Sequence, residues 1–263
     1  MTAAPPESLA ALRARARELH DPAALALFAT RLQSDRRAGA RALAEACALR
    51  ARAAEREQRR LERLFALRGE LRGAGARLVA GVDEVGMGPL AGPVVAAAVV
   101  LRDEARLDGL DDSKRLTPST RARLDGEIRS QSEAFSIAEV WPEEIDALNI
   151  YRAGLEAMRR AVEGLAESPD HVLVDARTIP GIDAPQTALV GGDGRDASIA
   201  AASVVAKVHR DAIMQRLDGD FPGYGFARHK GYPTPDHLAA LRRRGPTPIH
   251  RRSFAPVAQL IRP

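Results

Sequence analysis

Four acidic residues stand where apolar runs of the sequence come to an end. They are Asp83, Glu84, Asp175 and Asp193. Ligands bind at the carboxyl ends of strands in α/β sheets, and carboxylates gathered there would repel one another without a divalent cation. Their oxygens suit Mg²⁺ or Mn²⁺, and two such ions about 4 Å apart are the usual device for phosphodiester hydrolysis. Each acid taken alone fits a solvated strand end better, but the four together favour a metal site of this kind.

The first two acids belong to the segment GVDEVGMGPLAGP, residues 81–93. Successive side chains of a strand point to opposite faces, so Asp83 and Glu84 can face one site only if the chain bends at this point. The glycines that follow would permit the bend and would let the backbone approach another molecule closely. We therefore expect a metal and a phosphate to meet here.

A long helix is predicted over about 196–217, directly after Asp193. Ser203 and Lys207 are four residues apart and hence neighbours on its surface, with Arg210 on the same face. The opposite face, suited to the core, carries Ala201, Val204, Val205, Val208 and Ala212. The first face could present a hydroxyl and a cation to a phosphate near the metals. The alternative is an amphipathic helix with an ordinary solvent face.

Aromatic and basic residues alternate in FPGYGFARHKGYPTPDH, residues 221–237. Aromatic residues make up only 4% of the chain, so their clustering here is unusual. Together such groups form stacking and charge platforms for nucleic acid. An apolar cluster beneath a long loop explains the Phe residues equally well, but explains Tyr232 less well. His229, His237 and His250 lack the spacing of metal ligands and are predicted to be hydrogen-bonding groups.

The rest of the pattern predicts a mixed α/β sheet with helices packed on it. Apolar runs predict strands over 77–82, 93–101, 133–140, 171–176 and 187–190. Helices are predicted over about 118–128, 142–165, 196–217 and 234–245. Three early strands followed by alternating helices and strands favour this architecture.

Residues 1–76 differ in composition from the rest of the chain. They are rich in Ala, Arg, Leu and Glu, predict two or three helices, and end in a GAGA linker. They carry a net charge of +6, whereas the remainder carries −2. We expect a helical basic extension over 1–76 and an α/β domain over 77–263. The extension suggests a polyanionic partner, although charge alone favours a solvated Arg/Glu helix surface.

Bulk composition places the chain among ordinary soluble proteins. Its 263 residues are 45% hydrophobic and 28% charged. No apolar run is long enough for a transmembrane helix, and the first ten residues lack the features of a secretory signal. Cys47 is the only cysteine, which excludes an internal disulfide and a cysteine-based zinc site. We expect a cytoplasmic monomer with no membrane partner.

From about residue 77 to the C-terminus, the sequence resembles bacterial ribonuclease HII, the type 2 ribonuclease H. The matching motifs, in order, are AGVDEVGMGPLAGPVVAAAVVL, DDSKRLT, VLVDA, GGDGRDASIAAASVVAKVHRD, FPGYGFARHKGYPTPDH and HRRSFAPV. The resemblance implies a ribonuclease H-like fold and a catalytic domain over 77–263. It also implies hydrolysis of the RNA strand of RNA–DNA hybrids and incision on the 5′ side of ribonucleotides embedded in duplex DNA.

The resemblance implies roles for individual residues. The family's metal-binding acids fall on Asp83, Glu84, Asp175 and Asp193, and the implied cofactor is Mn²⁺ or Mg²⁺. Its substrate-binding positions fall on Gly86, Met87, Gly88, Asp112, Ser113, Lys114, Ser203, Lys207 and Tyr232. The glycine motif would sense the junction between RNA and DNA, and Tyr232 would stack on the substrate.

Two positions depart from the family's pattern. Met87 stands where arginine is usual, and Gly191 where lysine is common. An arginine would grip a phosphate in a charge-assisted contact worth about 1.5–3 kcal/mol, which methionine cannot make. Recognition of a 2′-hydroxyl by the backbone of Gly86 and Gly88 does not depend on that side chain. We expect retained chemistry, weaker substrate binding and a looser junction preference.

Two alternatives to a ribonuclease HII activity remain open from the sequence. A ribonuclease HIII-like enzyme would act on runs of ribonucleotides, and the change at Met87 is compatible with that. A hybrid-binding protein would have kept the fold without catalysis, but the presence of all four acids argues against it. Because both departures remove positive charge while residues 1–76 carry +6, we also expect the extension to hold the duplex.

Overall fold

The computed structural model describes residues 7–261, which fall into two compact units. The first unit extends to Glu62 and the second begins at Arg63. Across residues 7–261, no helix combines the length and apolar character needed to cross a membrane.

The first unit is helical, as the composition predicts. It contains α1 (Leu9–Glu18), α2 (Pro22–Gln33) and most of α3 (Ala38–Gly73). Ser8 and Asp21 cap the first two helices by accepting backbone N–H groups at 3.1 and 2.7 Å. The apolar faces meet in a small core of Leu12, Leu25, Phe28, Leu32, Ala44 and Cys47, among others. This packing gives the extension a core of its own.

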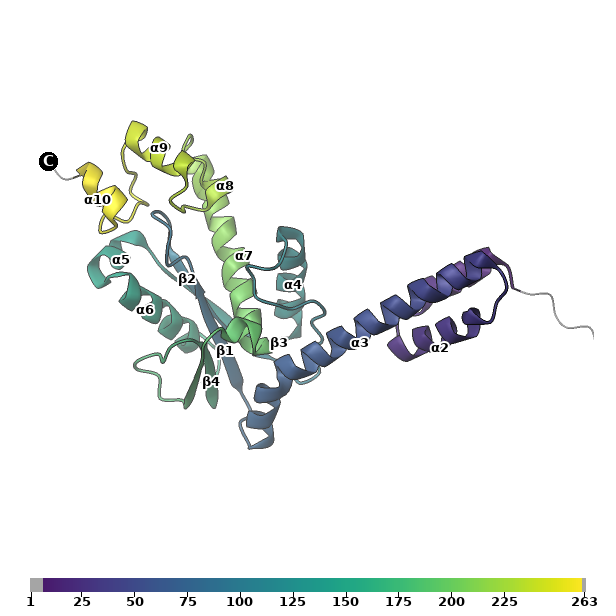
Figure 1. The fold of residues 1–263 in the computed structure, drawn as a ribbon. Coiled ribbons are helices and arrows are strands. Elements are labelled where there is room, and N and C mark those ends of the chain that lie inside the picture. Colours follow the sequence, from purple (N-terminus) through teal and green to yellow (C-terminus); the bar gives the residue numbers. More distant parts are fainter. Residues whose placement is uncertain (1–6, 262–263) are drawn as a thin grey trace, which may run out of the picture. The chain divides into compact units, whose positions relative to one another are not determined.

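The second unit is built on a five-stranded mixed sheet (Figure 1), which confirms the predicted fold class. Its strands are β1 (Val79–Val85), β2 (Val94–Leu101), β3 (Ser132–Val140), β4 (His171–Asp175) and β5 (Gln186–Leu189). They lie in the order β3-β2-β1-β4-β5. Antiparallel pairing joins β1, β2 and β3, whereas β1, β4 and β5 are parallel. The carboxyl ends of the three parallel strands therefore share one edge of the sheet.

Helices cover both faces of this sheet (Figure 1). The helices of this unit after α3 are α4 (Pro118–Gln131), α5 (Pro142–Leu148), α6 (Ile150–Glu163), α7 (Ala197–Asp220), α8 (Phe226–His229), α9 (Pro235–Arg244) and α10 (Ala255–Ile261), of which α6 and α7 lie on the sheet. Ala80 and Val82 of β1 belong to a core cluster with α6. Gly81 between them faces α7, where a Cβ would lie 2.0 Å from the backbone carbon of Ser198. Only glycine allows α7 to cross β1 this closely.

Two helical predictions need correction. The single helix expected over 142–165 is broken into α5 and α6 at Asn149, whose φ of 74° lies in the left-handed region. Asn tolerates that conformation, and its side chain caps α6 by accepting the N–H of Arg152 at 3.1 Å. The alternative interpretation of α7, an ordinary solvent face, is also wrong over the first part of the helix, because Ala197–Ala206 are all buried.

The last turns of α3 belong to the second unit rather than to the extension. Leu67 and Leu71 pack against a buried cluster of Val79, Leu173 and Ile199. The division at residues 62 and 63 thus differs from the expected boundary at 76, because α3 continues as one helix past the first unit's core. The expected linker at 73–76 is the turn after this helix.

Candidate active site

Asp83 and Glu84 both lie inside β1, whose pairing with β2 continues in regular register through Val85. The bend expected between the two acids is therefore wrong, because β2 keeps this part of β1 extended. Gly81 faces α7, so Asp83, two residues further on, lies on the same face. The side chain of Glu84, the next residue, leaves the strand on the opposite face of the sheet.

The other two acids follow β4 and β5. Asp175 is the last residue of β4, and its Oδ1 accepts the N–H of Gly192 at 2.7 Å. Gly192 opens the short 3₁₀ helix η1 (Gly192–Gly194), which comes after β5 and holds Asp193. The hydrogen bond ties η1 to the end of β4, and thus places both acids at the same edge of the sheet.

Three of the four acids, Asp83, Glu84 and Asp193, have raised pKa values. Burial is the main cause of the raised pKa of Asp83, and the charges of Glu84, Asp175 and Asp193 raise it further. Burial also raises the pKa of Glu84 and of Asp193, and the charge of Asp175 adds to both. For Asp193, Asp112 contributes as well. A bound cation would relieve this repulsion and favour the ionised carboxylates.

The donor chemistry of this edge fits a hard divalent cation. Oε2 of Glu84 is buried and has no hydrogen-bond partner among the described residues. A buried carboxylate oxygen left unpaired is unfavourable unless a positive charge meets it. Within residues 7–261, however, no three His, Cys, Asp or Glu side chains lie close enough together to hold a metal ion as they stand. The acids therefore suit a divalent cation by their ligand type and charge, but their side chains are not arranged around a metal position.

Ser113, Lys114 and Ser203 lie beside the acids. The hydroxyls of Ser113 and Ser203 are 2.9 Å apart, and a hydrogen bond from Ser203 moderates the raised pKa of Asp83. Lys114 Nζ donates to Asp193 at 3.4 Å while its side chain stays exposed. Residues from three distant parts of the chain thus come together here.

Lys207 and Arg210, predicted on the same face of α7, have different surroundings. Lys207 Nζ pairs with Asp211 at 2.8 Å. Arg210 is fully buried, and one of its donors reaches the carbonyl of Lys230 at 3.0 Å. The prediction for Arg210 is wrong, because residues far away in the sequence cover this side of α7.

Two buried arginines hold residues 86–93, the glycine loop. Arg210 and Arg251 come from different ends of the fold and donate to the loop's backbone carbonyls from inside the protein. The acceptors are Gly86, Met87, Ala91, Gly92 and Pro93, at 2.6–3.2 Å. Burial lowers the pKa of Arg210 to about 10 and that of Arg251 to about 9. Both stay protonated at neutral pH, so two guanidinium cations hold the glycine loop in place.

The centre of the glycine loop lies between α6 and the segment after α8. A Cβ at Gly154 of α6 would lie 2.9 Å from Met87 Sδ, so the Met87 side chain rests on this glycine. A Cβ at Gly88 would lie 3.6 Å from the ring of Tyr232, which is exposed. A backbone hydrogen bond also joins the glycine loop to the segment after α8, because Leu90 N donates to the carbonyl of Gly231 at 2.8 Å. The loop and Tyr232 therefore form one surface.

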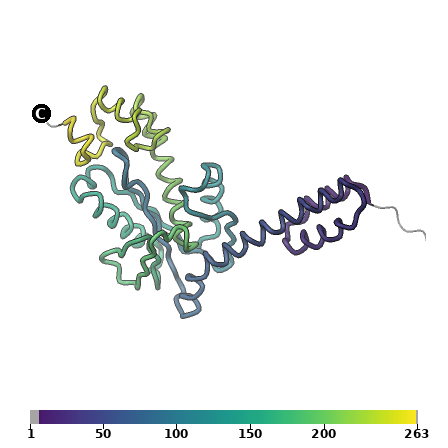
Figure 2. Tube along the Cα trace, viewed as in Figure 1, coloured from purple at the N-terminus to yellow at the C-terminus, as the bar shows by residue number. Residues whose placement is uncertain are grey.

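A chain of buried histidines supports Tyr232 from behind. The N–H of Thr247 donates to Nδ1 of His250, so the proton of His250 is on Nε2. That proton is donated to Nε2 of His237 at 3.1 Å, and His237 in turn donates from Nδ1 to the carbonyl of Tyr232 at 2.9 Å. In Figure 2 the C-terminal segment carrying His250 lies beside the turn that joins β1 and β2, as the Ala91–His250 bridge requires. The histidines thus act as hydrogen-bonding groups.

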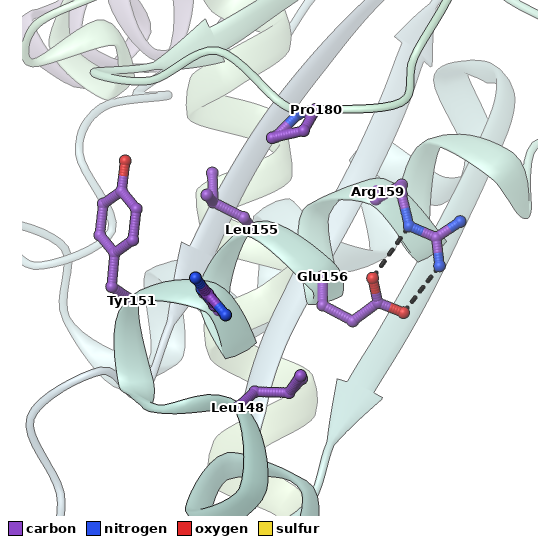
Figure 3. Close-up of a pocket in the computed structure, with 7 residues that line it drawn as sticks. Leu148, Tyr151, Leu155, Glu156, Arg159 and Pro180 are labelled. Carbon is purple, nitrogen blue, oxygen red and sulfur yellow. Dashed lines mark hydrogen bonds and ion pairs between the residues drawn. The ribbon is translucent and has the colours of Figure 1, made fainter.

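A pocket of about 390 Å³ lies on α6 and not at the acids (Figure 3). Its lining residues are Leu148, Tyr151, Arg152, Leu155, Glu156, Arg159 and Pro180. Glu156 and Arg159 pair with each other along one side of it, as the dashed lines show. None of the four acids lines this pocket, so the candidate catalytic residues and the pocket lie at separate places.

The family model described as "Ribonuclease HII" matches residues 80–257 of this chain. The chain belongs to the ribonuclease HII family. The matched span runs from β1 into α10 and includes all four acids, the glycine loop, Tyr232 and both buried arginines.

Curated relatives and solved structures agree with this assignment. Ribonuclease HII of Myxococcus xanthus is 52% identical over 231 residues, covering 88% of this chain and 79% of its own. Ribonuclease HII of Geobacillus kaustophilus is 54% identical and covers 78% of each chain. The ribonuclease H2 structure from Pyrococcus horikoshii has a TM-score of 0.61 at 28% identity, covering 70% of this chain and 96% of its own. The family match and these relatives favour a ribonuclease HII over a ribonuclease HIII. The Bst-RNase HIII structure, 19% identical with a TM-score of 0.52, shows the fold alone.

Proposed function

We propose that this protein hydrolyses the RNA strand of RNA–DNA hybrids and incises duplex DNA on the 5′ side of single embedded ribonucleotides. The observation that carries the proposal is the set of four acids at the carboxyl ends of parallel strands, within a chain of the ribonuclease HII family. Such a nuclease would use water as the nucleophile and leave 3′-hydroxyl and 5′-phosphate ends.

In this proposal Asp83, Glu84, Asp175 and Asp193 hold Mn²⁺ or Mg²⁺. Two such ions, when bound, would activate water and stabilise the leaving oxygen. The raised pKa values of Asp83, Glu84 and Asp193 support this assignment, because carboxylates that repel one another gain most from a cation. Ser203 orients Asp83, and Lys114 keeps a positive charge next to Asp193.

Substrate contacts follow from the surface beside the acids. The backbone of Gly86 and Gly88 would meet the 2′-hydroxyl of the ribonucleotide, and Tyr232 would stack on a sugar or base next to it. Anchoring of the glycine loop by Arg251 and of Tyr232 by His237 supports this, since a rigid pair of surfaces binds with less ordering cost. We further propose that the basic extension holds the duplex without reading its sequence, and that the protein acts as a cytoplasmic monomer.

A cleavage assay on two labelled duplexes tests the proposal. One duplex carries a single ribonucleotide in DNA, the other a run of four or more, and each is incubated with Mn²⁺ and separately with Mg²⁺. We expect incision on the 5′ side of the single ribonucleotide, abolished by Asp83→Asn. Asp108→Asn is the matched control, because Asp108 is an exposed acid outside the proposed metal-binding and substrate-binding residues.

The other outcomes each favour an alternative. Cleavage of the ribonucleotide run alone would indicate a general hybrid nuclease of the ribonuclease HIII kind. Binding of both duplexes without cleavage in either metal would indicate a hybrid-binding protein whose acids no longer catalyse.

A further inference from the structure

Arg177 is a second cation next to the acids, on the side of Glu84. Its Nη1 lies 3.4 Å from Glu84 Oε1, and its side chain is 29% exposed. Nη1 itself is buried, yet it makes no hydrogen bond within the part of the chain that the structure describes. The contact is thus an ion pair that leaves this donor of the guanidinium unused.

Two features hold Arg177 in this position. Its guanidinium carbon lies over the ring of Tyr151 in α6, 5.2 Å from the ring centre, a cation–π contact. The preceding Ala176 has a φ of 56°, a left-handed conformation that residues with a Cβ adopt rarely. This turn directs the chain after Asp175 back toward Glu84, where Arg177 pairs.

Arg177 also lies close to the glycine loop. A Cβ at Gly154 would lie 2.9 Å from Met87 Sδ and 3.5 Å from Arg177 Nη1. The thioether and the guanidinium therefore share one small area over α6. Met87 offers no donor there, so Arg177 is the group in this area that could bind an anion.

The other cations near the site have different positions or partners. Lys114 lies on the Asp193 side, and Lys207 pairs with Asp211. The guanidinium groups of Arg210 and Arg251 bind backbone carbonyls inside the protein. Arg177 and Lys114 therefore place one positive charge on each side of the acids, next to Glu84 and Asp193 respectively.

We propose that Arg177 binds a phosphate of the nucleic-acid duplex beside the glycine loop, a contact that Met87 cannot make. The inference rests on the proposed function. When Glu84 shares its charge with a bound cation, its hold on Arg177 weakens, and the partly exposed guanidinium can turn toward the phosphate oxygens. Tyr151 keeps the guanidinium in place, so Arg177 is presented to the phosphate in a fixed orientation.

Duplex binding tests this independently of cleavage. The dissociation constant is measured by fluorescence anisotropy, with the single-ribonucleotide duplex and Ca²⁺, in chains that carry Asp83→Asn. We expect Arg177→Met to weaken binding about 10- to 100-fold, as loss of a charge-assisted contact does. The slope of log affinity against log salt should become shallower by about 0.9, since one phosphate contact is lost. Arg152→Met is the matched control, because Arg152 is an exposed arginine of α6, and it should leave both quantities nearly unchanged.

A second arm changes the substrate and leaves Arg177 intact. Phosphates of the ribonucleotide strand are replaced one at a time by uncharged methylphosphonates. One of these replacements should raise the dissociation constant of the chain that retains Arg177. The same replacement should leave the dissociation constant of the Arg177→Met chain unchanged. If the salt slope is unchanged in Arg177→Met and every replacement is additive with it, Arg177 only partners Glu84 and the proposal is wrong. Failure of the proposed function would be seen separately, as absence of cleavage by the unaltered chain.

Discussion

Arg251 places a positive charge inside the protein and uses it to hold main-chain carbonyls. It is fully buried and donates to Gly86, Met87 and Gly92, three acceptors spread along the glycine loop. Burial lowers the pKa of Arg251 to about 9, so the folded protein bears the cost of desolvating this cation. The gain is a loop whose shape is set from within, before any substrate arrives.

Replacement of Arg251 should therefore destabilise the protein. We expect Arg251→Met to lower the free energy of unfolding by about 3 kcal/mol, because buried carbonyls lose their donors. Urea denaturation followed by circular dichroism measures this. Arg252→Met is the control, since Arg252 is exposed, and should change stability by less than about 0.5 kcal/mol. Equal effects of the two substitutions would show that the loop does not depend on Arg251.

Met87 is the residue where the loop's chemistry can be changed most directly. Its side chain rests on Gly154, so an arginine at this position would give up that contact and extend toward the substrate. We expect Met87→Arg to lower the KM for a single-ribonucleotide duplex about three- to tenfold, less than the full value of a charge-assisted contact. Met87→Gln, of similar length but uncharged, should not do so. A KM that rises in Met87→Arg would mean that repulsion from nearby Arg177 outweighs the new contact.

At the scale of elements, apolar runs predicted the strands well, most directly for β1, β2 and β4, where burial in the sheet selects apolar residues. The misses have physical causes that do not show in periodicity. Asn149 breaks a continuous helical pattern by adopting a φ of 74°. Arg210 falls on the polar face of α7, but Pro93 and Lys230 supply carbonyls that allow it to be buried there.

The acids show the same limit on sequence reasoning. Asp83 and Glu84 were expected to need a bend, yet β2 holds both in a regular ladder. Nothing in the sequence distinguishes Arg177, because a lone arginine after a strand has no characteristic pattern. Its position depends on the left-handed turn at Ala176 and on Tyr151, which comes from another element.

The segment from α8 to His250 should make stability depend on pH. Burial and the charge of His237 lower the pKa of His250 to about 4, and burial lowers the pKa of His237 as well. In the unfolded chain both titrate near 6.5, so between about pH 6.5 and 4 the unfolded state binds more protons. Stability is therefore lost as pH falls through this range, on the order of 3 kcal/mol for His250 alone.

Urea denaturation at pH 7.5, 6 and 5 measures this loss, with His250→Gln as the comparison. Burial raises the pKa of Asp196 to about 6, which acts in the opposite direction over part of the same range. The difference between the two chains cancels that effect, because Asp196 is present in both. Parallel pH dependence in the two chains would rule out His250 as the cause.

At the scale of the whole molecule, α3 serves two units. Its first part completes the core of the extension, whereas its last turns cover the cluster of Val79, Leu173 and Ile199. Arg68, on these last turns, is buried and donates to the carbonyl of Leu101. A boundary drawn at the turn over 73–76 would thus remove part of the second unit's own core.

Two truncations distinguish the roles of the two parts. Deletion of 1–62 should leave the second unit folded and able to cleave, with a higher KM and a shallower salt slope, because twelve arginines are removed against eight acids. Deletion of 1–76 also removes Leu67, Arg68 and Leu71, and should lower the melting temperature by about 10 °C, since a loss of 3–5 kcal/mol shifts a domain of this size by that much. Thermal unfolding and steady-state cleavage at several salt concentrations measure both effects.

Each truncation has an outcome that would contradict its prediction. An unchanged KM and salt slope after deletion of 1–62 would exclude the extension as a duplex-binding element. Equal melting temperatures for the two truncations would place the boundary of the second unit at residue 76.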